Sequence, residues 1–233
     1  AKEMGYERNV MASNLRKGVA KTVGIIVPRI NRQFFSNVIS SAESILEEAG
    51  YTVIICQSHE TLEDEIKALK TMRANQVAGV LISHSIQSVN GDHILENIHD
   101  GVELVQFDRV FDNLPGIKVV NDGVKGSYEA TKSLIANGYK KIGTLAGYLG
   151  AQLFKDRKEG YVMALKEAGM PVDEDIIFED SILRATGYQS ALKAIERGCD
   201  ALYCAGDFSA LGAFDAVREA GLDVPEQFGT IGT

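Results

Sequence analysis

The sequence predicts an α/β protein built from two doubly wound, parallel β-sheets, and three observations support that fold class. From residue 22 onward, short runs of β-branched residues alternate with segments whose apolar residues recur at helical spacing. The strand-like runs are continuously apolar, which is typical of parallel strands that helices cover on both faces. The runs are also too numerous for one ordinary sheet. We therefore expect two lobes, with a ligand cleft between them.

The first part of the chain carries repeats of this strand–helix pattern. Residues 23–27 are a β-branched run that ends at Pro28. The apolar stripe of the following helix, 35–49, ends at Gly50, and the next helix, 62–73, is also apolar along one side. The other elements predicted here are strands at 52–56, 79–82 and 103–107, a helix near 93–99 and an extended run at 117–120.

The second part continues the alternation. A helix at 125–137 ends at Gly138, a strand at 141–146 follows, and the stretch 147–150 is the natural crossover between lobes. The remaining predicted elements are strands at 176–178, 201–205 and 229–231 and helices at 156–168, 186–197 and 209–220. We expect a front segment at 1–21, an N-terminal lobe at 22–146 and a C-terminal lobe at 147–233.

Composition is that of an ordinary globular protein. Apolar residues make up 45% of the 233 residues and charged residues 24%, and no apolar run approaches the ~18 residues that span a membrane. The front lacks an apolar signal segment, so we expect a cytoplasmic protein, although a mature secreted form would share this feature. Cys56, Cys199 and Cys204 lack metal-ligand spacing and are expected to be buried, reduced thiols.

Charge is unevenly distributed along the chain. The net charge of −8 argues against nucleic-acid binding by the whole surface. The front segment is nevertheless basic. It carries Lys2, Arg8, Arg16, Lys17 and Lys21 against only Glu3 and Glu7. A basic front on an acidic body calls for an explanation.

Motifs that would indicate catalysis are missing from the sequence. There is no Walker A motif, nucleophile elbow, zinc-protease motif or dinucleotide-binding glycine motif. His59, His84, His93 and His99 do not share ligand spacing on one face, and such histidines are more often surface or core residues than catalytic ones. We therefore predict no enzyme, metal or cofactor.

Polar and aromatic residues follow several predicted strands. Phe34 and Phe35 come after the first strand, either as a hydrophobic staple or as rings that stack on a ligand. Asp108–Arg109 and Asp207 follow later strands, and Arg157 opens a helix, where a cation opposes the helix dipole. Charged residues populate loops anyway, but their convergence on strand ends favours a ligand with hydroxyl groups, which carboxylates and arginine bind in bidentate fashion.

The front segment 9–17 is short, basic and helix-capable, with Asn9 as a possible N-cap. It is too short to be a stable helix alone. One interpretation is a frayed terminus. The other is a segment that folds on DNA, with Leu15 as an apolar wedge in the minor groove.

Short motifs resemble those of the LacI/GalR family, in the family's order, along essentially the whole chain. Residues 1–6 resemble the end of its helix-turn-helix headpiece, and Tyr6-x-x-Asn9-x-x-Ala12-x-x-Leu15-Arg16 resembles its hinge helix. The core motifs are Ile25-Ile-Val-Pro28, Phe34-Phe35, Phe107-Asp108-Arg109, Asp122-x-x-x-Gly126, Gly138-Tyr-x-x-Ile142, Arg157-x-x-Gly160-Tyr161, Asp207-x-x-Ala210-x-Gly212 and Ala220-Gly-x-x-Val-Pro225. Each is common alone, but their order and spacing are specific.

The resemblance implies a cytoplasmic, homodimeric transcriptional regulator, expected to be a repressor, whose core resembles periplasmic binding proteins. A small molecule, expected to be a sugar or sugar derivative, would bind between the lobes and change how hinge helices engage operator DNA. No cofactor, metal or membrane is implied. The effector contacts carried over are Phe34, Phe35, Asp108, Arg109, Arg157, Ile182 and Asp207. The DNA contacts carried over are Asn9, Ala12, Ser13, Leu15 and Arg16.

The chain departs from the family pattern at three places. Ile182 stands where many relatives place a ring, and Leu153 stands where relatives often have a hydroxyl. The chain begins inside the headpiece motif and stops at Thr233, so we expect a fragment that ends before the return crossover. Two other functions are weighed against a regulator. A periplasmic-type sugar-binding protein for transport shares the fold but does not explain the basic front, and an α/β enzyme is not excluded by fold alone.

Overall fold

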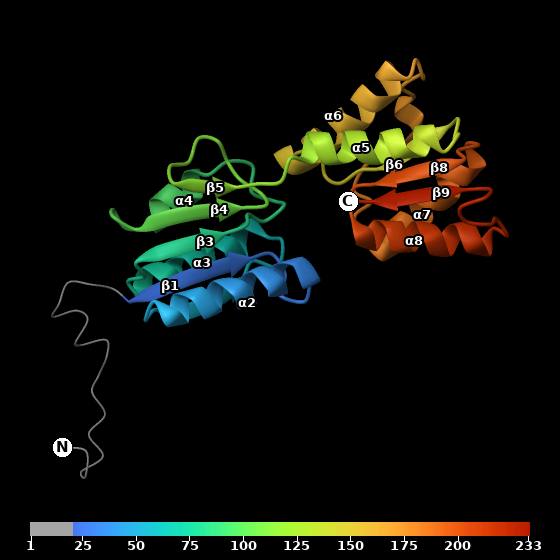
Figure 1. Cartoon of the computed structure of the whole chain (residues 1–233). Coiled ribbons are helices and arrows are strands. Elements are labelled where there is room, and N and C mark those ends of the chain that lie inside the picture. Colours follow the sequence, from blue (N-terminus) through green and yellow to red (C-terminus); the bar gives the residue numbers. More distant parts are fainter. Residues whose placement is uncertain (1–20) are drawn as a thin grey trace, which may run out of the picture. The chain divides into compact units, whose positions relative to one another are not determined.

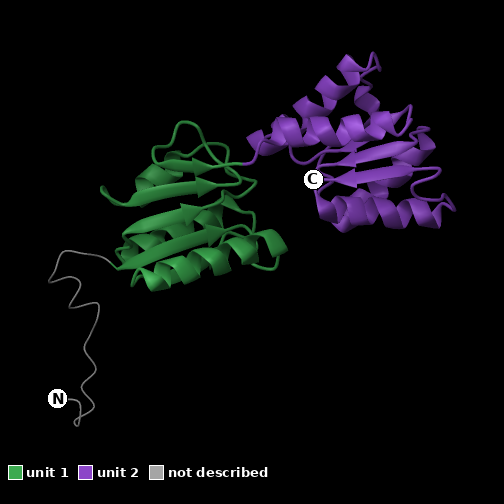
Figure 2. Cartoon of the chain, viewed as in Figure 1, with its two compact units in different colours: residues 1–120 green, residues 121–233 purple. Residues whose placement is uncertain are grey.

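The computed structural model describes residues 21–233, which form two compact units, 21–120 and 121–233 (Figures 1 and 2). Each unit has its own parallel β-sheet.

Unit 1 is a five-stranded sheet with the strand order β2-β1-β3-β4-β5, all parallel. Its elements are β1 (Thr22–Val27), α2 (Gln33–Glu48), β2 (Thr52–Gln57), α3 (Leu62–Ala74), β3 (Gly79–Ile82), α4 (Asp92–Asn97), β4 (Glu103–Phe107) and β5 (Ile117–Val119). These elements confirm the predicted alternation, and their bounds differ from the predicted ones by at most two residues.

Helices cover both faces of this sheet because successive residues of β1 point to opposite sides. Ile25 belongs to a cluster with Phe35 of α2. Ile26 belongs to a second cluster, with Leu69 of α3 and Ile94 of α4. All of these side chains are buried, and full burial of a side chain of this size contributes about 1.5–3 kcal/mol.

Unit 2 is a four-stranded sheet with the order β7-β6-β8-β9, again all parallel. Its elements are α5 (Gly123–Ala136), β6 (Ile142–Leu145), α6 (Gln152–Glu167), the 3₁₀ helix η2 (Glu174–Ile176), β7 (Ile177–Phe178), α7 (Arg184–Glu196), β8 (Ala201–Cys204), α8 (Asp207–Glu219) and β9 (Gly229–Gly232). The prediction of a second doubly wound sheet is confirmed.

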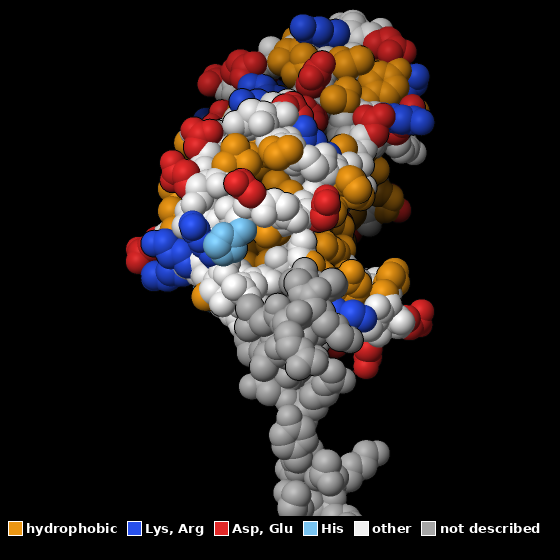
Figure 3. Space-filling model, turned by 90° about the vertical axis from the view of Figure 1, so that its left-hand side faces the viewer, with side chains coloured by type: hydrophobic (Ala, Val, Ile, Leu, Met, Phe, Trp, Pro, Cys, Tyr) orange, Lys and Arg blue, Asp and Glu red, His pale blue; other side chains and the backbone are white. Residues whose placement is uncertain are grey.

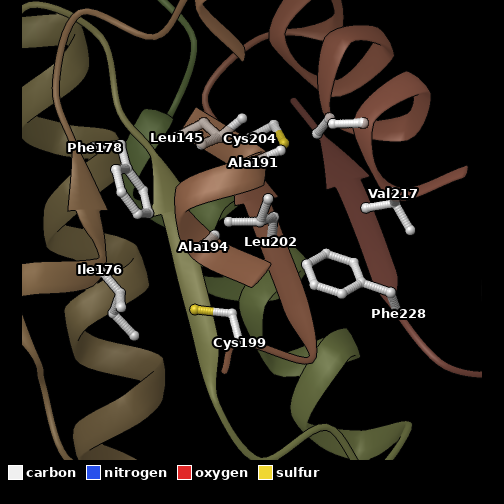
Figure 4. Close-up of a cluster of buried hydrophobic side chains, with 12 residues drawn as sticks. Leu145, Ile176, Phe178, Ala191, Ala194, Cys199, Leu202, Cys204, Val217 and Phe228 are labelled. Atoms are coloured by element: carbon white, nitrogen blue, oxygen red, sulfur yellow. The ribbon is translucent and has the colours of Figure 1, made fainter. Parts of the chain in front are cut away.

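The two faces of the second sheet are covered by different helix pairs. On one face, Tyr161 of α6 stacks on Tyr203 of β8 with ring centroids 6.3 Å apart, and its hydroxyl donates to the Ile142 carbonyl at 2.7 Å. On the other face, Leu202 of β8 packs with Val217 of α8 and other apolar residues in the cluster shown in Figure 4.

Two of the three cysteines lie in that second cluster (Figure 4). Cys199 and Cys204 are free and buried, whereas Cys56 is free and half-buried. Burial raises the pKa of the Cys199 thiol to about 11 and also raises the pKa of Cys204. The prediction of buried thiols is confirmed for these two, which are protonated core residues at neutral pH.

The chain divides between Val120 and Asn121, not between residues 146 and 147 as the sequence pattern predicts. The helix α5 and the strand β6, expected in the first lobe, belong to unit 2 because β6 pairs with β7 and β8. Helical and strand periodicities identify an element, but they do not say which sheet the element joins.

Glycines allow the helices of unit 2 to approach closely. A Cβ on Gly160 of α6 would lie 2.1 Å from the Val124 carbonyl oxygen of α5. A Cβ on Gly212 of α8 would lie 2.0 Å from the Arg184 carbonyl oxygen of α7. Because backbone atoms cannot yield like a flexible side chain, both positions require glycine. Arg157 lies on α6 and Asp207 lies on α8. The close packing of these helices therefore fixes the backbone positions of both residues.

We predict that Gly160→Ala lowers the free energy of unfolding by about 1–3 kcal/mol, because the added methyl group overpacks the α5–α6 contact. Urea denaturation followed by circular dichroism measures the change. Gly126→Ala on α5 is the matched control: its Cβ would meet nothing within 4 Å, so this substitution should be neutral or stabilise by up to about 1 kcal/mol. Equal effects of the two substitutions would contradict the close-packing argument.

Candidate functional site

The carboxyl edge of unit 1, where its parallel strands end, carries a hydrogen-bonded pair of polar side chains. Asp108 follows β4 and Ser83 follows β3, and the Ser83 hydroxyl donates to Asp108 Oδ2 at 3.3 Å. Asp108 has a φ of 62°, in the left-handed region that non-glycine residues seldom adopt. Its N–H donates to the Val119 carbonyl at 3.0 Å, which holds this conformation. Such backbone geometry is typical of ligand-binding edges.

The two phenylalanines at the start of α2 have different environments. Phe34 is 46% exposed, whereas Phe35 is 6% exposed and lies in the core. The ring of Phe35 packs edge-on against Phe107 at 6.3 Å and against Phe34 at 5.1 Å. Phe35 thus packs in the core and Phe34 is the ring with substantial exposed surface, while the contact of these rings with a ligand stays a prediction.

Arg109 lies next to Asp108, but its guanidinium is paired within the protein. Its Nη1 lies 2.6 Å from Glu60 Oε2 and its Nη2 lies 3.2 Å from Glu60 Oε1, so the pair is bidentate. Nη1 also donates to the His84 carbonyl at 3.1 Å. Glu60 is not among the residues that the sequence pattern predicts for the site. The available signal was its place in the segment that follows β2, three residues after that strand ends, because the segments after parallel strands lie at one edge of a sheet.

A fully buried carboxylate, Glu65, lies behind this pair. His93 Nε2 is 2.6 Å and His84 Nδ1 is 3.8 Å from Glu65 Oε1. The Ser85 N–H and the Ser88 hydroxyl also donate to Glu65. The spacing of the histidines in the sequence predicts no common site, but the structure places His84 and His93 beside the same carboxylate, Glu65. The missed signal is that Glu65 shares the buried face of α3 with Leu69 and Met72.

These contacts determine the protonation state of Glu65. Burial raises its pKa. The neighbouring imidazoles of His84 and His93 and the Ser85 N–H together lower the pKa by more than burial raises it, to about 2. Glu65 is therefore ionised at neutral pH. A buried charge is stable only when it has partners, and here those partners all come from the segment after β3 and from α4.

The carboxyl edge of unit 2 brings together the other predicted polar residues. Arg157 of α6 is half-buried, and its Nη1 donates to the Ala205 carbonyl at 2.7 Å. Asp207 is exposed at the first position of α8 and lies two residues beyond Ala205. Arg157 and Asp207 therefore both lie near the carboxyl end of β8. Ile182 follows β7 and is half-buried. Its neighbour Ser181 donates to the Ala146 carbonyl at 3.0 Å, which places Ile182 at the same edge.

The predicted hinge residues Asn9, Ala12, Ser13, Leu15 and Arg16 lie outside the described range, 21–233. Within it, no helix has the length and apolar character needed to cross a membrane, and no group of three or more acidic, histidine or cysteine side chains is arranged to hold a metal ion. Figure 3 shows one face on which acidic side chains are scattered among basic and apolar ones.

Two doubly wound units with polar carboxyl edges define the class of two-lobed ligand-binding proteins. A family model described as "Periplasmic binding proteins and sugar binding domain of LacI family" matches residues 20–231. The chain therefore belongs to the LacI family of transcriptional regulators.

Individual relatives agree with that assignment. The HTH-type transcriptional regulator RegA of Clostridium saccharobutylicum is 32% identical over 240 residues, covering 99% of this chain and 70% of the relative. The HTH-type transcriptional repressor PurR of Actinobacillus pleuropneumoniae is 30% identical over 239 residues, covering 99% and 68%. The solved structure of the transcription regulator CcpA of Lactococcus lactis matches with a TM-score of 0.84 and 29% identity, over 91% of this chain and 78% of that chain.

We predict that Glu65 stabilises the fold in a pH-dependent way. Its pKa falls from 4.5 in the unfolded chain to about 2 in the folded one. Its contribution is therefore fully present above pH 4.5 and is lost as the pH falls toward 2. A shift of this size corresponds to about 3 kcal/mol. Glu65→Gln should lower the free energy of unfolding by about that amount at pH 7 and by little near pH 2.

Urea denaturation between pH 2 and pH 7 tests this expectation. Glu63→Gln on the same helix is the control, because the Glu63 side chain is 80% exposed and contributes little at any pH. If the free energies of unfolding of wild type and Glu65→Gln differed by the same amount at every pH in this range, the lowered pKa of Glu65 would be contradicted.

Proposed function

We propose that this chain is the effector-sensing part of a cytoplasmic LacI-family repressor, which binds a sugar or sugar derivative with both units and relays its presence to hinge helices on operator DNA. The observation that carries the proposal is the presence of polar, ligand-type side chains at the carboxyl edges of both sheets. Asp108 with Ser83 in unit 1, and Arg157 with Asp207 in unit 2, belong to a chain whose family model describes a sugar-binding domain.

The chemistry of these side chains suits a neutral, hydroxyl-rich ligand. The carboxylates of Asp108 and Asp207 accept hydrogen bonds from hydroxyl groups, and Arg157 donates to ring or hydroxyl oxygens. Phe34 offers an exposed aromatic ring, on which a sugar face or a planar base stacks. A purine would use the same groups, and for this reason purines belong in the test. Ile182 would add an apolar contact from unit 2.

DNA binding is proposed for residues 9–16. Leu15 would act as the minor-groove wedge, with Asn9, Ala12, Ser13 and Arg16 beside it on DNA. The named relatives are transcriptional regulators, and this favours a regulator over a transport protein of the same fold. For the effector to control DNA binding, it must bind one arrangement of the protein more tightly than the other.

The proposed repressor is a homodimer, and one surface of unit 2 supports it. Phe208, Leu211 and Phe214 recur every three residues along α8, so they share one face of the helix. They are 41%, 50% and 38% exposed. Exposed apolar side chains that share one helix face favour contact with another protein surface, here a second copy of the chain.

We predict that the effector site requires Arg157. A panel of D-ribose, D-glucose, cellobiose, glucose 6-phosphate and hypoxanthine is screened by thermal shift. At about 100 times its Kd, a bound member stabilises the wild-type chain by about 2.7 kcal/mol. Arg157→Ala and Asp108→Asn should each weaken binding by about 1.5–3 kcal/mol, because each loses a charged hydrogen bond to the ligand. At the same ligand concentration the stabilisation should then fall to about 0.3–1.3 kcal/mol.

The control is Lys158→Ala, the neighbouring cation on α6, which pairs with Glu174 at 2.9 Å. This variant should respond like wild type. A panel member that stabilises wild type and Arg157→Ala equally would show that the site is elsewhere.

We predict that Leu211→Glu converts the dimer into a monomer, because a carboxylate on the apolar face of α8 would be desolvated without a partner. Sedimentation velocity measures the oligomeric state. The control is Met163→Glu, since Met163 of α6 is 45% exposed but lies on a different helix of the same unit. Sedimentation of Leu211→Glu like the wild type would contradict the α8 interface.

A further inference from the structure

Three charged side chains hold three consecutive residues of the segment that follows β3. Arg109 donates to the His84 carbonyl at 3.1 Å. Glu65 accepts from the Ser85 N–H at 2.5 Å, and Glu60 accepts from the Ile86 N–H at 3.0 Å. The charged groups come from three other segments, after β4, on α3 and after β2. We call Glu60, Glu65 and Arg109 the clamp.

The charged groups of the clamp are paired within the protein, although Arg109 Nε is buried without a hydrogen-bond partner among the described residues. Glu60 and Arg109 form the bidentate pair, with side chains 19% and 11% exposed. Glu65, which is 0% exposed, has His93 at 2.6 Å. Bidentate arginine–carboxylate pairs and buried charge-assisted hydrogen bonds have strict geometry. The clamp therefore fixes the path of the backbone from His84 to Ile86 and does more than neutralise charge.

Backbone strain at the same edge points in the same direction. His59 and Glu60 have φ values of 49° and 67°, and Asp108 has a φ of 62°. Residues in this region persist only where the surroundings hold them. Glu60 and Arg109 are the partners that join the strained segment after β2 to the strained segment after β4.

We propose that Arg109 is a positioning residue, not an effector contact, and that with Glu60 it sets the location of Ser83 and Asp108. Ser83 immediately precedes the clamped residues, and Asp108 immediately precedes Arg109. The hydrogen bond between Ser83 and Asp108 therefore joins two segments that the Glu60–Arg109 pair already holds. The part that concerns the effector rests on the proposed function, whereas the clamp itself does not.

The first experiment needs no effector and measures amide hydrogen exchange by NMR. Glu60→Ala should speed exchange of the Ile86 amide about tenfold and leave Ser85 within about twofold. Glu65→Ala should speed exchange of the Ser85 amide about tenfold and leave Ile86 within about twofold. Arg109→Ala should also speed exchange at Ile86, because Glu60 loses its anchor. Unchanged exchange at Ile86 in Arg109→Ala would overturn the clamp.

The second experiment measures affinity by calorimetry, with the member of the same panel that stabilises wild type most. Glu60→Ala and Arg109→Ala should weaken binding by the same factor, about tenfold or more, and the double variant should lose no more than either single one. A loss in Arg109→Ala that Glu60→Ala does not share, or losses that multiply in the double variant, would show that Arg109 touches the effector. Unchanged affinity in both single variants would overturn the positioning role.

The control is an ion pair of the same unit, in which Lys118 Nζ lies 3.7 Å from Asp112 Oδ1. Alanine at either position should change neither the amide exchange of Ile86 nor the affinity for the effector. If the alanine variants of the clamp do not fold, Glu60→Gln and Arg109→Lys replace them, since each keeps the size of the side chain but loses the bidentate pair. If no panel member binds wild type, the proposed function fails, and the exchange experiment still decides the clamp.

Discussion

The parallel direction of every strand is the constraint on which the rest of this structure depends. Because all strands of a sheet run the same way, each must be followed by a crossover, and the helices of those crossovers cover both faces. Both faces of the sheet are therefore apolar, as Ile25 and Ile26 show in unit 1. Polar side chains that follow consecutive strands can then gather only where the strands end.

The two units meet this constraint differently at their carboxyl edges. In unit 1, the clamp and its histidines form a buried polar network that connects the segments after three strands. In unit 2, the position of Arg157 and Asp207 depends on close backbone contact between helices, which Gly160 and Gly212 permit. Unit 1 therefore depends on hydrogen-bond geometry, and unit 2 depends on steric fit. Both solutions give a rigid edge.

The sequence allowed the fold class and the order of elements to be predicted, because the helical and strand periodicities are strong and the stop signals are clear. Asp108 and Asp207 were predicted for the same reason, since each follows the end of a strand. Arg157 was expected to open a helix, but α6 begins at Gln152, so Arg157 lies in its second turn and reaches the edge through its hydrogen bond to the Ala205 carbonyl. The boundary between units could not be predicted, since strand pairing is a tertiary property. Nor could the patterns distinguish Phe34 from Phe35, because the burial of adjacent residues depends on the exact start of a helix.

The histidines show most clearly where reasoning from a single sequence fails. His84 and His93 are nine positions apart in the chain and belong to different elements, so their spacing carries no signal, yet both lie beside Glu65. A charged residue on the buried face of α3 was the one available indication. Buried ion pairs are seldom the most stabilising use of space, since apolar residues of the same volume often do as well. What apolar residues cannot do is accept hydrogen bonds from the Ser85 and Ile86 backbone, which lies outside any strand ladder.

Under the proposed function, that requirement connects the network to regulation. An effector changes the state of a regulator only by binding one arrangement more tightly than another. If the edge that holds the effector deformed easily, binding energy would go into ordering that edge and would discriminate less between arrangements. A carboxylate or guanidinium with strict hydrogen-bond geometry resists such deformation. Under the proposed function, the cost of burying Glu65 is thus offset by a fixed backbone path at Ser85, two residues beyond Ser83.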